Sequence, residues 1–435
     1  MSFLHHQSCE CTKTELDLFS LPPTQTSIEN GQWIHYKPIS TLGDDAPLEF
    51  VVPGHGDEYI DLSHTLISIT ARVERRAQVA DDDSVIGPIN LWLHSLFSQI
   101  DVLLNQKLVT PPSNTYPYRA YVETLLNYGP AAKSSHLTSS LWYDDTPGKM
   151  DDSRENEGAK KRRRYTDGGR LVEMMGHLHC DLFNQEKFLL NGVEMRLKLV
   201  RTKSGFNMMA SRDYENVAVK ILDAALLVRK VKISPSVLIA HSRALEKSTA
   251  KYPLTRVDIK TVTISRDVQS KTMDNIYLGQ LPKRVIVGFI SNAAFNGDIK
   301  KNPYNFQNFD LTFLSLYVDG QQVPSKPLQP DFSGSGLFLQ AYHTLFSGTG
   351  IHFQDDGNGI PREGYKDGFF LTAFDLTPDL EANSSHWSLQ RHGSLRLEVR
   401  FKNALIETVN CLVYAEFNNI LEIDRHRNVG VDYSS

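Results

Sequence analysis

The chain of 435 residues carries one set of sequence landmarks twice, in the same order. In each half, a polar turn after an apolar run is followed by a helical apolar segment, an alternating strand and a closing strand. The paired landmarks are residues 105–107 and 319–321, 124–126 and 344–346, 195–199 and 395–399, and the closing strands Ala225–Ile233 and Ala415–Ile423. Their offsets are 214, 220, 200 and 190 residues (105 to 319, 124 to 344, 195 to 395, 225 to 415). A solenoid repeat has a period of roughly 20–50 residues, so this much longer period predicts two tandem domains of one fold.

Alternating segments in both halves predict the fold class. Leu395, Leu397 and Val399 alternate with Arg396 and Glu398, which is typical of a strand with one buried face. A parallel fold would need a helix after nearly every strand, and few helical segments are present. We therefore predict an all-β fold of two tandem antiparallel jelly-roll β-sandwiches with a few short helices.

Local signals divide the chain into four parts. Residues 1–40 are polar, contain Pro22-Pro23 and are predicted to form an N-terminal arm that packs on a neighbour or stays mobile. Ser234-Pro235 begins a predicted helix, because Ser favours the N-cap and Pro the first turn. The expected organisation is an arm (1–40), a first jelly roll (41–233), a helical linker (234–250) and a second jelly roll (251–435).

Composition bounds the function classes. Hydrophobic residues make up 40% and charged residues 22% of the chain, and the net charge is −5, so bulk electrostatics do not favour a polyanion as partner. Four cysteines imply no disulfide framework. The sequence has neither a membrane-span pattern nor a signal-peptide pattern, and we expect a protein made and used inside a cell.

The strongest run of charge is basic: Lys160, Lys161, Arg162, Arg163 and Arg164. It lies in segment 147–169, which has no apolar period and is predicted to be a surface loop. The run fits a nuclear import signal or a basic surface loop, and acidic residues just before it favour a self-neutralising loop. Direct nucleic-acid binding is not expected.

Three patterns invite a metal interpretation, and each has a simpler one. His177 and His179 would share one face of a strand, but Glu186 lies too far on to complete a cupin-type set. The pairs His5-His6 and Cys9/Cys11 lie in the arm without a second ligand pair. The turn-rich segment 355–359 resembles part of a calcium loop, but Glu363 comes too early for the last ligand. The sequence therefore assigns no metal ligand and no cofactor. It assigns no catalytic residue either, although paired carboxylates would leave no local motif.

Overall pattern also suggests a family. Residues 15–28, 96–106 and 116–126 carry the resemblance, which extends over essentially the whole chain. The sequence resembles the double jelly-roll, hexon-like major capsid proteins of Polinton (Maverick) elements and adintoviruses. This resemblance implies homotrimers that act as pseudo-hexameric capsomers and tile an icosahedral shell around double-stranded DNA. It also implies penton and minor capsid proteins as partners, and a virion assembled inside the host cell, with the nucleus open as the place of assembly.

Two other function classes remain open at this stage. An intracellular enzyme on paired jelly rolls, of amidase or bicupin type, predicts a cleft between the halves with convergent acids or a metal. A domesticated adaptor with two binding sandwiches predicts a monomer that forms no shell.

Overall fold

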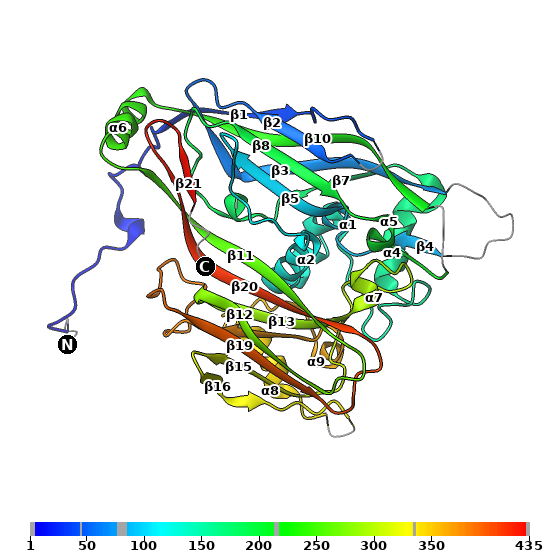
Figure 1. The fold of residues 1–435 in the computed structure, drawn as a ribbon. Helices are drawn as coiled ribbons and strands as arrows, with labels where there is room; N and C mark the ends of the chain where they lie inside the picture. Colours follow the sequence, from blue (N-terminus) through cyan, green and yellow to red (C-terminus); the bar gives the residue numbers. More distant parts are fainter. Residues whose placement is uncertain (1–4, 44–45, 76–84, 213–216, 334–335, 432–435) are drawn as a thin grey trace.

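A computed structural model describes residues 5–43, 46–75, 85–212, 217–333 and 336–431, so the first four residues of the predicted arm lie outside it. Each half of the chain forms an antiparallel β-sandwich, and the exposed helix α6 (Pro235–Leu245) connects them in sequence (Figure 1). The predicted all-β class is confirmed, and α6 lies within the segment 234–250 where a linker helix was predicted. No helix of the described part is long and apolar enough to cross a membrane.

The first sandwich consists of two four-stranded sheets and a short strand pair. One sheet has the order β1 (Ile28–Tyr36), β10 (Val217–Ile233), β3 (Glu58–Arg75), β7 (Val172–His177), and the other has the order β2 (Leu48–Val52), β8 (Met195–Arg201), β5 (Phe97–Leu104), β6 (Lys107–Leu108). The short pair is β4 (Ile86–Pro88) with β9 (Met208–Ala210).

The second sandwich repeats this order. One sheet runs β11 (Ala250–Ile264), β20 (Val409–Ile423), β13 (Arg284–Ser291), β18 (Leu371–Asp375), with β21 (Val429–Val431) also on β20, and the other runs β12 (Ser270–Gln280), β19 (His392–Phe401), β15 (Leu311–Val318), β16 (Gln321–Leu328). A short pair joins β14 (Phe306–Gln307) and β17 (Asp367–Gly368). The paired landmarks occupy equivalent strands, β8 with β19 and β10 with β20, so the predicted duplication is confirmed.

The polar turns of the two halves adopt the same conformation. Asn105 and Gln106 have φ of 45° and 67°, and Asp319 and Gly320 have φ of 50° and 78°. Two consecutive positive φ values are the signature of a type I′ hairpin turn, whose twist matches that of the strands on either side. Each turn joins an edge strand to the neighbouring strand of its sheet, β6 to β5 and β16 to β15.

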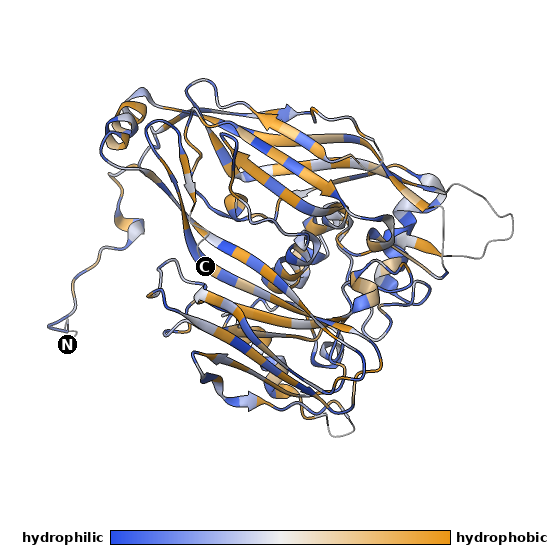
Figure 2. Ribbon diagram, in the orientation of Figure 1, coloured by the Kyte–Doolittle hydropathy of each residue, from blue (hydrophilic) through white to orange (hydrophobic). Residues whose placement is uncertain are grey.

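Alternation along the strands builds the cores. In β19, Leu395, Leu397 and Val399 are buried while Arg396 and Arg400 are not, as predicted. Figure 2 shows the same change between hydrophobic and hydrophilic residues along strands of both sandwiches.

The first strand begins earlier than the sequence suggested. Residues 28–36, assigned to the arm, form β1 and pair with β10. The polar composition is explained by position: β1 lies at the edge of its sheet and most of its residues are exposed. The arm that leaves the body therefore consists of the residues before Ser27, and it includes the 3-10 turn η1 (Thr14–Leu16).

The remaining helices are short. They are α1 (Trp92–Ser95), α2 (Tyr116–Asn127), α3 (Pro130–Lys133), α4 (Glu157–Thr166), α5 (Ser204–Asn207), α7 (Asn292–Phe295), α8 (Leu339–Ser347) and α9 (Arg362–Tyr365), with 3-10 turns η2 (His136–Ser140), η3 (Asp167–Gly169) and η4 (Asp181–Asn184).

The prediction of a surface loop over residues 147–169 is wrong, because α4 lies within it. Asn156 caps this helix by accepting hydrogen bonds from the backbone N–H groups of Gly158 and Ala159. The buried face consists of Gly158, Ala159, Arg162 and Thr166, none of which is a large apolar residue. Hydrophobic periodicity therefore gave no helical signal here.

The two cores exchange elements. Tyr252 and Leu254 of β11 and Leu421 and Ile423 of β20 belong to the core of the first sandwich, although the rest of these strands lies in the second. In return, α2 contributes its apolar residues to the core of the second sandwich. Each half thus contributes residues to the core of the other. The predicted boundary at residue 250 therefore separates the two halves in sequence but does not separate their hydrophobic cores.

Candidate functional site at the junction of the two sandwiches

Helix α2 fills the junction between the sandwiches (Figure 1). Every residue from Tyr116 to Leu126 is buried. The ring of Tyr121 stacks on that of Tyr304 from the second half, with centroids 4.1 Å apart and an interplanar angle of 5°. Tyr118 packs edge-on to Tyr304, and the Tyr304 hydroxyl lies 2.7 Å from Ser95 Oγ. Stacked and edge-on rings add stability beyond their buried area, so this cluster ties the halves together.

A buried ionic network lies on another side of α2. The guanidinium of Arg119 contacts Glu123 Oε1 at 2.7 Å and Asp181 Oδ1 at 2.6 Å, and His179 Nδ1 lies 2.7 Å from Glu123 Oε2. The second half reaches this network, since Tyr414 Oη donates to Glu123 Oε1 at 3.3 Å. The charges of this network pair within the first half, and the Tyr414 hydroxyl connects them to the second half.

The network determines the protonation of its members. Burial acts to raise the pKa of Glu123, but Arg119 and His179 outweigh it and lower that pKa to about 2. Burial, reinforced by His179 and His177, lowers the pKa of His94 well below its usual value. Glu123 is thus ionised and His94 neutral near pH 7.

The basic run of the sequence is divided by α4. Arg162 is fully buried and its guanidinium contacts Asp145 Oδ1 at 2.7 Å, where both side chains have no exposed surface. It also donates to the carbonyl oxygens of Pro88 and Tyr143. Lys161 and Arg164 are exposed, whereas Lys160 and Arg163 are partly buried and contact Glu157 and Asp167. The predicted self-neutralising character is present, but the middle of the run is a structural residue of the interior.

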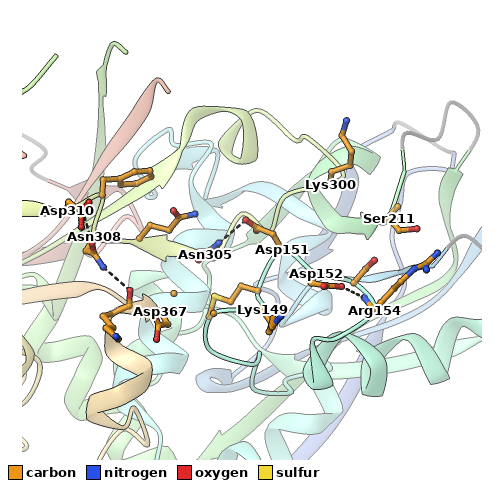
Figure 3. A pocket seen from close by; sticks show the side chains of 18 residues that line it. Lys149, Asp151, Asp152, Arg154, Ser211, Lys300, Asn305, Asn308, Asp310 and Asp367 are labelled. Carbon is orange, nitrogen blue, oxygen red and sulfur yellow. Dashed lines mark hydrogen bonds between the residues drawn. The ribbon is translucent and has the colours of Figure 1, made fainter. Parts of the chain in front are cut away.

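Asp145 and nearby Asp151 accept hydrogen bonds from the second half. Asn302 Nδ2 donates to Asp145 Oδ2 at 3.1 Å, and the Asn302 backbone N–H donates to Asp151 Oδ1 at 2.8 Å. Figure 3 shows Asp151 receiving a second bond, from Asn305 Nδ2 at 3.0 Å. Asp151 and Asn305 line a polar cavity of 790 Å³ between segment 148–154 and residues 305–310. Positively charged lysines and negatively charged aspartates both line its walls, so the cavity presents no uniform charge to a ligand (Figure 3).

The predicted metal patterns do not assemble into ligand sets in the part of the chain that the structure describes. His177 Nε2 lies 3.1 Å from the Phe183 carbonyl oxygen and His179 contacts Glu123, while Glu186 is exposed beside α6. The arm residues His5, His6, Cys9 and Cys11 are exposed.

Segment 355–359 is a turn that contacts the first half. Asn358 is buried, its side chain accepts a bond from the Ile360 N–H, and its carbonyl accepts one from Lys133 Nζ. Burial lowers the pKa of Lys133 to about 8. Elsewhere in the described ranges, Asp379, Glu381 and His386 form one cluster with metal-like spacing, and all three are exposed.

Comparison with known proteins places the fold. No protein-family profile matches the chain. An uncharacterized protein of Caenorhabditis elegans is 26% identical over 431 residues, which cover 95% of this chain and 99% of that protein. A chain of the Sputnik virophage structure matches 100% of this chain and 94% of its own length, with a TM-score of 0.65 and 11% identity. The fold is a double jelly roll.

Two further solved structures share this double jelly roll. The major capsid protein of mavirus has a TM-score of 0.54 and 12% identity, with 99% of this chain and 97% of that chain covered. A chain of the capsid of virus PBCV-1 has a TM-score of 0.57 and 9% identity, with 96% and 100% covered. The structural neighbours are thus viral capsid proteins, matched over both jelly rolls.

Sequence reasoning found the double jelly roll but missed most of the junction. Arg119 and Glu123 lie in α2 and Asp181 lies in η4, and no local spacing rule connects Asp181 to the helix. The signal that could have located them is the charge inside α2: Arg119 and Glu123 lie four residues apart in an otherwise apolar helix. A charged pair on an apolar helix indicates a buried partner elsewhere.

Proposed function

We propose that this chain is a structural major capsid protein that trimerises into pseudo-hexameric capsomers. The observation that carries the proposal is the equivalence of the two sandwiches in strand order, together with the full-length match to viral capsid proteins. Three copies would place six similar wedges around a threefold axis. Such a block fits a lattice of sixfold units, with closed symmetry inside the trimer and open-ended contacts between trimers.

The junction suits this role because a capsomer needs its wedges at a constant angle. The stack of Tyr121 on Tyr304 and the hydrogen bonds of Tyr414 to Glu123 and of Asn302 to Asp145 connect the halves from several directions. A packed aromatic core and paired buried charges resist relative motion. The proposed shell is icosahedral and encloses double-stranded DNA, as the sequence resemblance to Polinton and adintovirus capsid proteins implies, with penton and minor capsid proteins as further partners.

The mass of the purified protein tests the proposal. Light scattering of the full chain at micromolar concentration should give three times the chain mass of 49.1 kDa, about 147 kDa. A strictly monomeric species would contradict it. Negative-stain microscopy of concentrated protein separates the capsid protein from a domesticated adaptor, because only the capsid protein should form sheets or shells.

The enzyme alternative predicts a cleft with convergent acids between the halves. A cleft of 790 Å³ is present there, lined by Glu123, His177, His179, Tyr414 and Glu416 among others. However, Glu123 has its pKa lowered to about 2, so it is a poor general acid near neutral pH. Its oxygens are already occupied by Arg119, His179 and Tyr414. The observed contacts therefore favour a structural role for this cleft.

The basic run stays a proposal as a nuclear import signal, with Lys161 and Arg164 as its accessible members. Arg162 is not accessible to a partner while α4 is folded, since none of its side chain is exposed. Replacing Lys161 and Arg164 by Ala together should shift a fluorescent fusion from the nucleus to the cytoplasm. An unchanged distribution would leave α4 with its structural role alone.

A further inference from the structure

The arm carries a group of large apolar side chains that stay exposed within the part of the chain that the structure describes. Leu16, Leu18, Phe19 and Leu21 are 69%, 75%, 96% and 90% exposed. Four large apolar side chains within six residues are a costly surface to leave in water, since full burial of each contributes about 1.5–3 kcal/mol. Figure 1 shows the arm leaving the body beside α6 and extending away from it.

A groove of matching character lies where the arm begins. It has a volume of 560 Å³ and lies between α6 and the end of the first sandwich. Its walls are largely apolar and include Ile28, Phe188, Val237, Leu245 and Tyr252. Helix α6 has no buried residue, so its inner face is only partly covered.

Charge also matches between the arm and the groove. Lys187 and Lys251 lie at the groove with one acidic residue, Glu186, whereas residues 14–21 carry Glu15 and Asp17 and no basic residue. Rim charges of opposite sign favour encounter and orient an apolar segment as it enters.

The geometry of the arm's exit favours the groove of another copy over its own. Gln25 accepts from the Ile28 N–H at 2.7 Å and donates to the Ile28 carbonyl at 3.1 Å, which fixes the chain where it leaves the groove. Pro22-Pro23 then restricts the backbone, including Leu21, to extended conformations. A chain held straight in this way does not fold back over residues 21–27. Fully extended, the 12 residues from Leu16 to Ser27 are 11 steps apart end to end and span roughly 36 Å, enough to reach a neighbour.

We propose that residues Thr14–Leu21 of one copy dock in the groove between α6 and the first sandwich of a neighbouring copy. The leucines and Phe19 enter the apolar groove, and Glu15 and Asp17 face Lys187 and Lys251. The arm of each copy thereby fastens the next one. This inference rests on the proposed self-assembly and names a surface that performs it.

Site-specific cross-linking of the full chain tests the docking. The background carries Cys9→Ser and Cys11→Ser, because these two exposed thiols would compete, whereas Cys180 and Cys411 are buried. Two chains of different tag length, one with Phe19→Cys and the other with Ala244→Cys in the groove wall, are co-expressed and mildly oxidised. We expect a shift to a heterodimer band that reducing agent removes. The matched control pairs Phe19→Cys with Ile406→Cys, which is 88% exposed on a distant loop, and should give no such band.

The outcomes separate this inference from the proposed function. A trimer by light scattering without the heterodimer band overturns the docking alone, and a monomer overturns both. A chain carrying both cysteines that forms only an internal disulfide shows the arm in its own groove and also overturns the docking between copies. Adding Leu18→Asp to the chain with Phe19→Cys should abolish the band with no change in the melting temperature of the single chain's fold, because Leu18 is 75% exposed there.

Discussion

Helices α2 and α8 occupy the same place in the order of their sandwiches, after the hairpin that the type I′ turn closes, yet they pack differently. Helix α8 lies against β18 of its own sandwich and buries only Ala341 and Leu345. Helix α2 is buried on all sides between the two sandwiches. The two sandwiches thus share their strand order, whereas the helix that follows the hairpin fills the junction only in the first half.

The same asymmetry applies to charge. The junction contains buried ionic groups, Arg119, Glu123 and Asp181 around α2 and Arg162 with Asp145 beside α4. They lie mainly in the first half and receive hydrogen bonds from Asn302 and Tyr414 of the second. The two sandwiches thus have the same strand order but differ in the charged residues that they contribute to the junction.

Arg162→Ala should destabilise the protein most. It leaves Asp145 charged and buried without its partner, which costs about 3–5 kcal/mol of unfolding free energy. Denaturant titration measures the loss. The matched variant Arg164→Ala, on the exposed side of α4, should change stability by no more than about 0.5 kcal/mol. Equal small effects of both variants would restore the interpretation of this run as a solvated surface segment.

Tyr121→Ala should separate the two sandwiches. Loss of a fully buried aromatic ring costs about 3–5 kcal/mol, and here the ring contacts both halves, so calorimetry should resolve two unfolding transitions. Tyr121→Phe is the control: the Tyr121 hydroxyl is buried without a hydrogen-bond partner, so its removal should be nearly neutral. A comparable change of a tyrosine in α8, Tyr342→Ala, should cost about 1–2 kcal/mol and leave one transition, because Tyr342 is only partly buried. If Tyr342→Ala also splits the transition, α2 has no special place.

Stability should fall with acid through His94. Its pKa is lowered in the folded protein, so the unfolded chain takes up a proton first as pH falls below about 6.5. The contribution of His94 is therefore present above that pH and lost below it, amounting to about 2 kcal/mol by pH 5. Unfolding free energy measured from pH 7.5 to 5 should show this slope. His94→Phe should flatten the curve, and an unchanged slope in that variant would assign the acid sensitivity to other groups.

A swap between the two equivalent turns should give the smallest effects, of opposite sign. Gln106→Gly places the residue that tolerates positive φ in the first turn and should stabilise by about 0.5–1 kcal/mol. Gly320→Gln should destabilise by about 1 kcal/mol through conformation alone, since open space surrounds that position. Thermal melts of both variants measure the difference. Changes of the same sign would mean that the two hairpins are not equivalent.

The repeated parts of this protein can be predicted from the sequence alone. The strands show a period of two, the polar turns have residues that tolerate positive φ, and the linker helix begins with a capping residue. Each of these patterns is local, so it can be recognised without knowing which segments pack against it. These patterns were sufficient for the double jelly roll and for the equivalence of β8 with β19 and β10 with β20.

Helix α4, strand β1 and the buried charges of the junction became apparent only in the tertiary structure. Helix α4 carries no apolar period, because its buried face consists of small residues and an arginine whose partner, Asp145, lies 17 positions away. Strand β1 looked like part of the arm, because an edge strand keeps most of its side chains in water. Glu123 is contacted by His179 and Tyr414, which lie 56 and 291 residues further along the chain. Burial of charge depends on such distant partners, and no local pattern encodes them.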